Sequence, residues 1–376
     1  MKGMKIALVH DHLAQDGGAE KVLAAFQEIW PHAPIFVVVY DPKHANKFFA
    51  DKKIETSFIQ RLPFGVKKYK WYLPLYPSAV EDYDLSNYDL VLSSSSAFAK
   101  GVITQPNALH ICYCHTPTRF LWSDTHSYIR ELGVSSFIKK ILPLFLSNIR
   151  LWDKLAAERV DKFIANSKLV QHRIHKYYKK DSDIIYPPVE AKKFFISDRP
   201  KEYFLAGGRL VPYKRFDLII EAFNRLGRPL KIFGTGPELE YLKSQAKPNI
   251  EFLGRVSDED KAKLYQDALA FINPQEEDFG ITMVESMASG RPVLAFNAGG
   301  AQEIVVLKKT GDFFYEQTWE DLADLIVRFK SENYDPQTVR EYALKFDTEN
   351  FKKQIKEYVE NTYYNLNNQQ QFKIKK

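Results

Sequence analysis

The sequence predicts an α/β protein with two domains, each built on a parallel sheet. Its 376 residues are too many for one ordinary core and suit two domains of typical size. Short apolar runs typical of buried strands alternate with helical spacing, first up to residue 187 and again over 203–350. Two consecutive prolines, Pro187 and Pro188, lie between the two series, and such a stiff, extended linker fits a hinge. The predicted domains are therefore residues 1–187 and 188–350.

The composition excludes several classes of protein. With 45% hydrophobic, 14% aromatic and 27% charged residues, the chain is typical of a globular protein. A net charge of +6 suits an anionic ligand or membrane surface but is too small to indicate nucleic acid. Cys112 and Cys114 form no usual disulfide, which favours a reducing compartment. Because we find no signal peptide and no apolar span of about eighteen residues, we expect a cytoplasmic protein, at most peripheral at the inner face of the membrane.

The first predicted strand, residues 5–9, leads into two histidines and then a glycine pair. Gly17 and Gly18 precede a segment of helical spacing, so a glycine-rich turn opens onto a helix N-terminus. This arrangement attracts phosphate, although a plain tight turn explains the glycines equally well. His10 and His12 lack further ligands at metal-site spacing, so we expect loop or hydrogen-bonding roles and no metal.

Residues 61–77 alternate basic residues with aromatic residues and prolines. Lysine and arginine attract anionic headgroups, and tryptophan and tyrosine settle at the interface, so one interpretation is contact with a membrane surface or a lipid acceptor. The alternative is a loop whose rings pack into the first domain. Residues 137–146, which include Lys139 and Lys140, offer a second apolar and basic surface.

Residues 109–114 form another predicted buried strand, and His115 follows at its carboxyl end. Ligands of open α/β sheets bind at this end of the strands. A histidine there can hydrogen-bond a sugar hydroxyl or a departing phosphate, and the alternative is a purely structural role. Residues 162–165 form the last predicted strand of the domain.

The second domain begins with a strand at residues 203–206, followed by glycines, Arg209 and Lys214 at a helix entrance. These side chains can neutralise a diphosphate, because arginine offers a bidentate fork and lysine a movable point charge. Ion pairs with nearby acids are the alternative. The adjacent Arg215 leaves open which side chain reaches a ligand.

The next two strand–turn units are less specific. Residues 230–233 precede Gly234-Thr235-Gly236, which is a weak dinucleotide fingerprint because the third glycine is missing. Residues 251–254 precede a helix that Ser257 or Asp258 could cap.

The most informative stretch is residues 268–292, which predict a strand, a polar loop and a helix. The predicted helix ends at Gly290, because glycine is common just after the C-terminus of a helix. Free backbone amides at the start of the helix can bind hydroxyls or a phosphate. Glu277 lies on the loop and Glu285 about one turn inside the helix. The two carboxylates can hold two parts of an elongated polar ligand, and the alternative is a solvated loop and helix surface.

The chain ends with helical patterns at residues 319–329 and 347–364. In the second of these, the side chains that share one face are Phe351, Ile355, Tyr358, Val359 and Thr362. Residues 365–376 form a polar tail that we expect to be disordered.

The segment around Glu277 carries a family resemblance. Its pattern is Glu-x-Phe-Gly-Ile-x-x-x-Glu-x-Met-Ala-x-Gly-x-Pro-Val, followed by Gly-Gly-Ala-Gln-Glu-Ile at residues 299–304. The pattern closely resembles the signature of retaining glycosyltransferase family 4, and the likeness extends over most of residues 5–350. It implies the GT-B fold, in which two Rossmann-like domains face a central cleft. The first domain would hold the acceptor, joined by the C-terminal helix at about 351–364, and the second would hold the donor.

The resemblance also implies roles for particular residues. Arg209 and Lys214 would stabilise the departing diphosphate, Glu277 would orient the donor sugar, and His115 would contact that sugar. Glu285 would hold the ribose, Gly17 and Gly18 would face the diphosphate, and the backbone at Val256 would hold the base. The implied donor-binding residues are Gly17, Gly18, Val256, Asp258, Lys261, Phe279, Gly280, Ile281 and Glu285.

The implied donor is GDP-mannose. The spacing of Val256, Asp258 and Lys261 resembles that of guanosine-dependent mannosyltransferases of the family, and one carboxylate can accept both donors of guanine. Asp258 as a helix cap is the alternative. Residues 274–280 are similar to bacterial O-antigen and exopolysaccharide mannosyltransferases.

We therefore expect retaining transfer of mannose to a glycan or polyprenyl-linked glycan in cell-surface polysaccharide synthesis. No cofactor or obligatory metal and no nucleic acid would take part. The alternatives are a UDP-sugar donor, a catalytically silent nucleotide-sugar-binding module, and an NAD(P) oxidoreductase.

Overall fold

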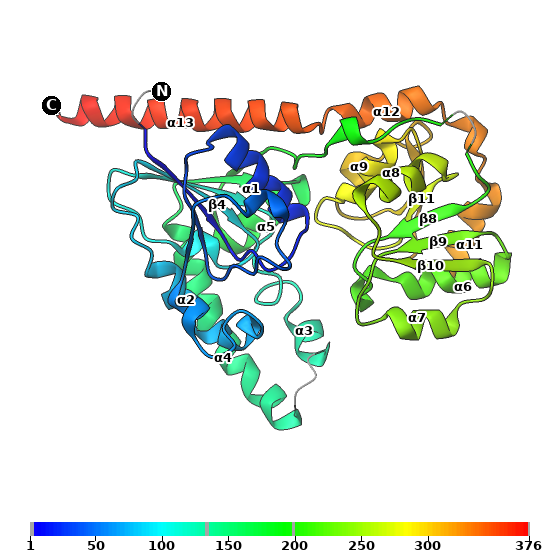
Figure 1. Cartoon of the computed structure of the whole chain (residues 1–376), viewed down its shortest axis with the longest axis horizontal. Coiled ribbons are helices and arrows are strands. Elements are labelled where there is room, and N and C mark those ends of the chain that lie inside the picture. The colour runs from blue at the N-terminus through cyan, green and yellow to red at the C-terminus, as the bar shows by residue number, and fades with distance from the viewer. Residues whose placement is uncertain (1–3, 132–134, 198–199, 375–376) are drawn as a thin grey trace. The chain divides into compact units, whose positions relative to one another are not determined.

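The computed structural model describes residues 4–131, 135–197 and 200–374 (Figure 1). The chain divides into two compact units. Unit 1 comprises Met1–Tyr186 with Phe351–Lys376, and unit 2 comprises Pro187–Asn350. The division follows Tyr186, whereas the sequence pattern suggested a boundary after Pro187.

Unit 1 contains a seven-stranded parallel sheet with the order β3-β2-β1-β4-β5-β6-β7. Its central strands are buried along their whole length, as the continuous apolar runs predict. The strands are β1 (Ile6–His10), β2 (Ile35–Val37), β3 (Ile54–Thr56), β4 (Leu90–Ser95), β5 (Leu109–Cys114), β6 (Lys162–Ala165) and β7 (Ser182–Ile184).

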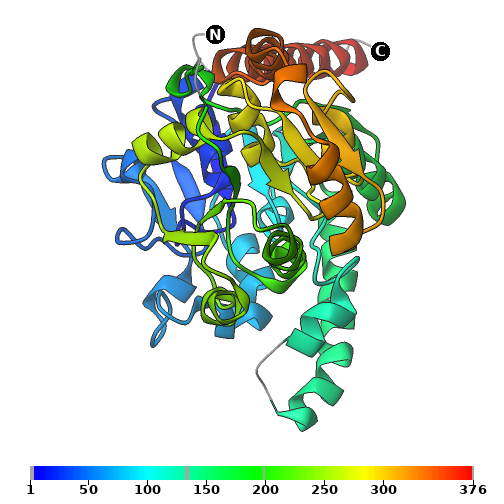
Figure 2. The ribbon, with the colours of Figure 1, turned by 90° about the vertical axis from the view of Figure 1, so that its right-hand side faces the viewer.

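Helices cover both faces of this sheet. One face packs against α1 (Gly18–Ile29) and α13 (Thr348–Ile374), which inserts Phe351, Ile355 and Val359 into the core beside Phe26. The other face packs against α2 (Tyr76–Glu81), α4 (Ser136–Glu158) and α5 (Lys168–Tyr178). A short helix, α3 (Thr125–Glu131), precedes α4, whose first turns extend beyond the sheet (Figure 2).

Two expectations for unit 1 need correction. The segment 61–77, which one of its two interpretations treats as a loop, starts at the last residue of the 3-10 helix η2 (Phe58–Arg61), contains η3 (Tyr69–Leu75) and then enters α2. Its aromatic and proline residues lack a helical period, so the pattern gave no sign of these turns. Residues 365–374, expected to be disordered, continue α13 to Ile374. Extending an existing helix needs no new nucleus, and glutamine and lysine are good helix formers.

Unit 2 contains a six-stranded parallel sheet with the order β10-β9-β8-β11-β12-β13. The strands are β8 (Phe204–Gly207), β9 (Leu230–Phe233), β10 (Ile250–Gly254), β11 (Phe271–Asn273), β12 (Val293–Phe296) and β13 (Gly311–Phe314). The helices are α6 (Phe216–Leu226), α7 (Leu239–Gln245), α8 (Asp258–Asp267), α9 (Ile281–Ala288), α10 (Ala301–Ile304), α11 (Trp319–Arg328) and α12 (Pro336–Leu344).

Both sheets reverse their strand order at one place. The reversal lies between β1 and β4 in unit 1 and between β8 and β11 in unit 2. Loops from neighbouring strands diverge to opposite faces at such a switch point, which leaves a crevice at the carboxyl ends of the strands. The loops after β1, β4, β8 and β11 are therefore the first places to search for a site.

Candidate active site

Lys214 and Glu277 form an ion pair at the switch point of unit 2. Lys214 ends the 3-10 helix η6 (Pro212–Lys214) after β8, and Glu277 lies on the loop after β11. The Lys214 ammonium donates to Oε1 of Glu277 over 2.7 Å, and the Gln275 amide donates to the same oxygen over 2.8 Å. The side chains of Lys214 and Glu277 are 14% and 18% exposed, so both remain within reach of a ligand.

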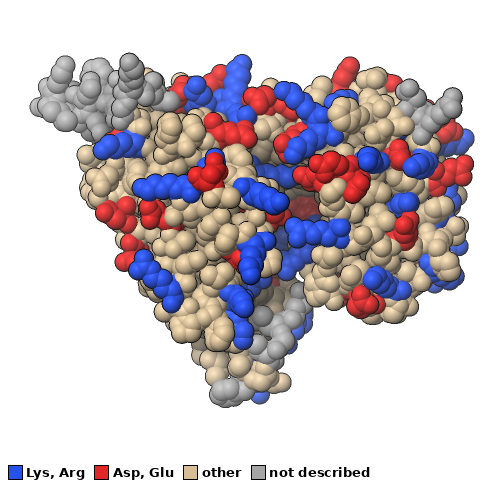
Figure 3. All heavy atoms as spheres, in the orientation of Figure 1, with Lys and Arg blue, Asp and Glu red and all other residues tan. Residues whose placement is uncertain are grey.

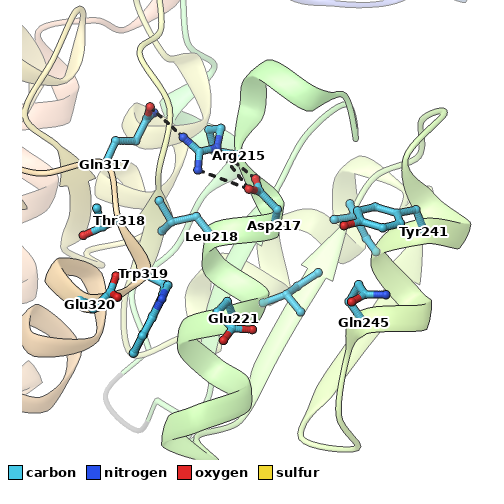
Figure 4. A pocket seen from close by; sticks show the side chains of 12 residues that line it. Arg215, Asp217, Leu218, Glu221, Tyr241, Gln245, Gln317, Thr318, Trp319 and Glu320 are labelled. Carbon is cyan, nitrogen blue, oxygen red and sulfur yellow. Dashed lines mark hydrogen bonds and ion pairs between the residues drawn. The ribbon is translucent and has the colours of Figure 1, made fainter.

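The neighbouring Arg215 points elsewhere. Arg215 donates to Asp217 and to Gln317, toward a pocket of about 410 Å³ over α6 (Figure 4). Lys214, not Arg215, is therefore the cation paired with Glu277. Arg209 lies in the turn after β8 and is exposed, and its side chain forms no ion pair within the described ranges.

A glycine pair supports the loop that carries Glu277. The amide of Gly300 donates to the Glu277 carbonyl over 2.8 Å, and Gly299 forms a bridge with Glu277. A Cβ on Gly300 would lie 1.9 Å from the Phe279 carbonyl oxygen, so only glycine permits this approach. The loop then enters α9 through Gly280, with φ of 107°. Phe279, Gly280 and Ile281 are thus at the helix N-terminus, as predicted.

Glu285 is the centre of a second cluster in unit 2. It lies on α9 and is 2% exposed. Lys261 Nζ lies 3.2 Å from its Oε1, and the Tyr265 hydroxyl donates to its Oε2 over 3.2 Å. Burial and the neighbouring Glu285 charge raise the pKa of Tyr265, which keeps that hydroxyl a donor. The sequence suggested Glu285 and Lys261 but not Tyr265.

Asp258 is not the cap of its helix. Ser257 caps α8 by accepting a hydrogen bond from the Asp260 amide over 3.0 Å. Asp258 is the first residue of the helix, and its carboxylate lies 3.3 Å from Lys261 Nζ. Its side chain is 57% exposed, which leaves it accessible beside the Lys261–Glu285 pair. Val256 immediately precedes Ser257 and is partly exposed at the end of β10.

The Gly234-Thr235-Gly236 turn packs against protein backbone. A Cβ on Gly234 would lie 1.8 Å from the Gly208 carbonyl oxygen, and one on Gly236 would lie 2.1 Å from that of Leu210. The Leu210 amide also donates to the Thr235 carbonyl over 3.0 Å. These glycines allow two loops of unit 2 to touch, so their presence needs no dinucleotide to explain it.

The switch point of unit 1 is occupied by a buried hydrogen-bonded network. Asp11, directly after β1, accepts hydrogen bonds from the amides of residues 96–99 at 2.6, 3.0, 2.7 and 2.7 Å. These amides form the turn after β4, so the carboxylate of Asp11 ties the ends of β1 and β4 together. A ligand cannot use those four amides without displacing Asp11.

His10 and His115 meet on Ser94. Nδ1 of His10 lies 3.1 Å from both the carbonyl oxygen and the hydroxyl of Ser94, and that hydroxyl lies 2.8 Å from Nε2 of His115. On its other side, Nε2 of His10 lies 3.6 Å from Oε1 of Glu20 on α1. His10 and Glu20 are 3% and 2% exposed, and Ser94 is fully buried.

The surroundings raise the pKa of His10 and lower the pKa values of Glu20 and His115. Burial alone would lower the pKa of His10, but the hydrogen bond and charge of Glu20 outweigh it and raise the pKa above its ordinary value. Burial alone would raise the pKa of Glu20, yet His10 lowers it. For His115, burial and then the charge of His10 lower the pKa to about 4. At neutral pH His115 is therefore neutral, and the contact with Glu20 favours the charged form of His10.

The carboxylate of Glu20 also lies close to the glycine pair Gly17 and Gly18. Gly17 is the N-cap of α1 and Gly18 its first residue, as predicted. However, Oε2 of Glu20 would lie 3.1 Å from a Cβ on Gly17. A negative group therefore already stands at this helix N-terminus, where the resemblance implied the donor's diphosphate. The role of Gly17 and Gly18 toward that diphosphate stays a prediction.

Residues 61–77 contain both packed and exposed aromatic side chains. Leu62, Tyr69, Tyr72 and Leu73 pack against the core of unit 1. Phe64 and Trp71, in contrast, are 66% and 68% exposed, and the Lys68 ammonium lies 3.8 Å from the Trp71 ring centroid.

The sequence pattern missed several members of both clusters. Gln275, Tyr265 and Ser94 contact predicted site residues, and Glu20 contacts His10. In the sequence each looks like an ordinary polar member of its strand, loop or helix. Their partners are distant in sequence, apart from the Gln275–Glu277 contact, so no local spacing could reveal them.

Two doubly wound parallel sheets in one chain, each with polar side chains at its switch point, define the GT-B class of fold. Comparison with known proteins agrees. Residues 16–193 match the family model described as glycosyltransferase family 4, and residues 189–346 match the model described as glycosyl transferases group 1. The chain therefore belongs to the GT-B glycosyltransferases of group 1 and family 4.

Individual relatives are distant. An uncharacterised glycosyltransferase of Methanocaldococcus jannaschii is 28% identical over 47% of this chain and 52% of its own length. The O-antigen chain mannosyltransferase RfbU of Salmonella typhimurium is 26% identical over 58% of this chain and 64% of its own length. The chain thus spans about half to two thirds of these relatives. The crystal structure of Anabaena HepE with UDP and glucose superimposes with a TM-score of 0.71, at 20% identity, over 95% of this chain and 99% of HepE.

Among the helices of the described ranges, none is both long and apolar enough to cross a bilayer.

Proposed function

We propose that the protein transfers a sugar from a nucleotide diphosphate donor to an acceptor hydroxyl, with retention at the anomeric carbon. The observation that carries this proposal is the Lys214–Glu277 pair, 2.7 Å apart at the switch point of unit 2 and next to the N-terminus of α9. Positive charge and free helix amides stabilise the negative charge that grows on a departing diphosphate.

The Lys214–Glu277 ion pair suits a site in which these side chains exchange each other for groups of the donor when it binds. In the free protein, Glu277 neutralises Lys214, so the cation is not left unpaired in a partly buried position. A donor phosphate can replace the carboxylate as the partner of Lys214, because lysine has a long flexible stem and three donors. Glu277 is then released to accept hydrogen bonds from sugar hydroxyls. Arg209, exposed in the same turn region, can add a second cation.

The donor we favour is GDP-mannose. Asp258 does not cap α8, and its carboxylate is 57% exposed beside Lys261, where it can exchange its present partners for N1–H and the amino group of guanine. Glu285, buried against Lys261, suits the ribose hydroxyls. A mannosyltransferase of O-antigen chains is among the relatives. The alternative is a UDP-sugar, since HepE was crystallised with UDP and glucose.

The acceptor we favour is a glycan or polyprenyl-linked glycan in cell-surface polysaccharide synthesis. The charges of Lys214 and Arg209 would serve the diphosphate without an obligatory metal. Full transfer activity in excess EDTA is the expected result, and activity restored only by added divalent cation would contradict it.

The function is tested by a donor panel. GDP-mannose, UDP-glucose and UDP-galactose are compared for thermal stabilisation and for donor hydrolysis or transfer, using wild type and Lys214→Ala. The matched control is Lys231→Ala, because Lys231 forms a 3.0 Å ion pair with Glu251 in the same unit but outside the site. Stabilisation by GDP-mannose that Lys214→Ala weakens supports the proposal. Stabilisation only by UDP-sugars selects the alternative donor, and binding without any turnover selects a silent binding module.

We also propose that unit 1 contacts the inner face of an anionic membrane through residues 61–77. Exposed Phe64 and Trp71 flank Lys68, and Lys67 is exposed beside them. The first turns of α4 lie toward the same end of unit 1 in Figures 1 and 2. They expose Ile138, Ile141 and Leu144 next to Lys140. In Figure 3 blue side chains are spaced among tan ones over this part of unit 1. Aromatic rings with nearby lysines suit the headgroup region.

A further inference from the structure

Each ring nitrogen of His10 lies near an oxygen that can only accept hydrogen bonds, and Nδ1 also lies 3.1 Å from the Ser94 hydroxyl, which can donate or accept. Nδ1 lies 3.1 Å from the backbone carbonyl oxygen of Ser94, and Nε2 lies 3.6 Å from the Glu20 carboxylate. A carbonyl and a carboxylate offer lone pairs but no proton. An unprotonated Nδ1 would set its lone pair against that of the Ser94 carbonyl oxygen, and an unprotonated Nε2 would face the Glu20 carboxylate. The geometry therefore favours hydrogen on both ring nitrogens, which makes His10 an imidazolium ion. The raised pKa of His10, in which Glu20 overcomes the effect of burial, agrees with this geometry.

The charge on His10 decides the direction of the next hydrogen bond. The Ser94 hydroxyl lies 3.1 Å from Nδ1 of His10 and 2.8 Å from Nε2 of His115. A protonated Nδ1 cannot accept, so the hydroxyl proton has to go to Nε2 of His115. A neutral imidazole that accepts at Nε2 carries its own proton on Nδ1.

We propose that Ser94 is a positioning residue that, oriented by the Glu20–His10 pair, fixes His115 in the tautomer with its proton on Nδ1. Within residues 4–131, 135–197 and 200–374, Nδ1 of His115 makes no hydrogen bond, and the side chain is partly exposed. His115 therefore presents a hydrogen-bond donor at the carboxyl end of β5. Resting on the proposed function, this donor would bond an oxygen of the transferred sugar, and it would not act as a base.

The sheet contains a matched comparison one residue away. The Ser93 hydroxyl lies 2.9 Å from Nε2 of His110, and both residues are fully buried in β4 and β5. Because successive strand residues face opposite sides of the sheet, Ser93 points away from the face on which Ser94 meets His10. Ser93→Ala thus removes a similar buried serine–histidine contact without touching the His10–Ser94–His115 chain.

The test is the tautomer itself, measured by NMR on the full chain with 15N-labelled histidine. Two-bond 15N–1H correlations distinguish protonated from unprotonated ring nitrogens, and the His115 signals are assigned with His115→Gln. In wild type near pH 7 we expect two protonated nitrogens on His10 and, on His115, a protonated Nδ1 with an unprotonated Nε2. Ser94→Ala should shift the His115 signals toward a mixture of tautomers, whereas Ser93→Ala should change His110 alone. Glu20→Gln should return His10 to the neutral form.

Each outcome decides the inference. Nε2 protonated on His115 in wild type, or His115 signals unchanged in Ser94→Ala, would overturn it, and the wild-type measurement holds even if a variant fails to fold. In transfer assays, Ser94→Ala should lower kcat about five- to tenfold, as expected for loss of one oriented hydrogen bond. If wild type has the expected tautomer but transfers no sugar, the proposed function fails while the inference on Ser94 stands.

Discussion

The switch points of the two units carry different chemistry. In unit 2 the site residues are cations paired with carboxylates, Lys214 with Glu277 at 2.7 Å and Lys261 with Glu285 at 3.2 Å. In unit 1 the corresponding place holds histidines, a serine hydroxyl and backbone amides around one buried pair, His10 and Glu20. All nine histidines of the chain lie before residue 187, so unit 2 contains none.

This difference indicates that the two units are suited to different roles. The Lys214–Glu277 pair is partly exposed, so either member can change partner when a charged ligand binds. The network of unit 1 is buried, and breaking one of its hydrogen bonds would leave an unsatisfied polar group. Unit 2 is thus suited to a change of charge during the reaction, and unit 1 to holding the direction of a hydrogen bond. The following predictions test that distinction.

The largest effect is expected from Lys214→Ala in unit 2. The substitution removes a positive charge and leaves Glu277 to repel a diphosphate, so kcat/KM should fall by about a hundred- to thousandfold. Steady-state kinetics with the preferred donor measures this change. Lys231→Ala, which breaks the Lys231–Glu251 pair elsewhere in unit 2, should retain wild-type kinetics. Equal activity of Lys214→Ala and Lys231→Ala would remove the assigned role of the pair.

The next effect is expected from Glu285→Gln, which tests binding apart from chemistry. Loss of one charged hydrogen-bond acceptor should weaken donor affinity by about ten- to hundredfold, corresponding to roughly 1.5–3 kcal/mol. Isothermal titration calorimetry with the nucleotide alone gives the Kd. Glu251→Gln is the control, because Glu251 is 57% exposed and lies outside the cluster. An unchanged Kd in Glu285→Gln would end its role as the ribose ligand.

The sequence was sufficient to predict elements whose pattern lies within one short segment. The strand before Glu277 and helix α9 follow from a short apolar run, helical spacing and Gly290, and the structure places β11 and α9 there. The GT-B fold and the glycosyltransferase class followed from the signature at residues 277–304, and both are confirmed. Long-range contacts were beyond such reasoning. Lys214 and Glu277 are 63 residues apart, and only the resemblance suggested that they belong to one site.

The network of unit 1 was invisible for a related reason. Glu20 is 2% exposed, yet in the sequence it is one polar residue in the first turn of an amphipathic helix. Ser94 lies in a run of serines and meets His10 across 84 positions. Only parallel pairing of β1 with β4 and of β4 with β5 brings these groups together. Similarly, composition alone could not separate the exposed rings of residues 61–77 from the packed ones.

A smaller effect should distinguish the two units by how their stability depends on pH. Burial, with a contribution from Arg159, lowers the pKa of His110 to about 3, whereas the unfolded chain binds that proton near 6.5. Between these values the unfolded state binds more protons, so the free energy of unfolding falls as pH decreases below about 6.5. At pH 5.5 His110 alone should cost about 1.4 kcal/mol. The raised pKa of His10 has the opposite sign and adds stability as pH falls toward 6.5, so below 6.5 it does not offset the loss from His110.

Hydrogen exchange read by mass spectrometry can locate this effect. After correction for intrinsic exchange rates, amides of β4 and β5 should lose protection between pH 7 and 5.5, while those of β8 and β11 should not. In His110→Gln the pH dependence in unit 1 should become shallower. Equal loss of protection in both units would contradict a histidine origin, because unit 2 has no histidine.

The smallest effect concerns the proposed membrane contact of unit 1. Lys67 is exposed on the segment 61–77, and it makes no ion pair within the described ranges. A lysine near an anionic surface contributes about 1 kcal/mol, so Lys67→Ala should weaken binding to vesicles containing anionic phospholipid about fivefold. Co-sedimentation at low salt measures this binding. Lys330→Ala, an exposed lysine of unit 2, should leave it unchanged. Equal losses in the two variants would show that net charge alone drives binding, and the contact could not then be assigned to unit 1.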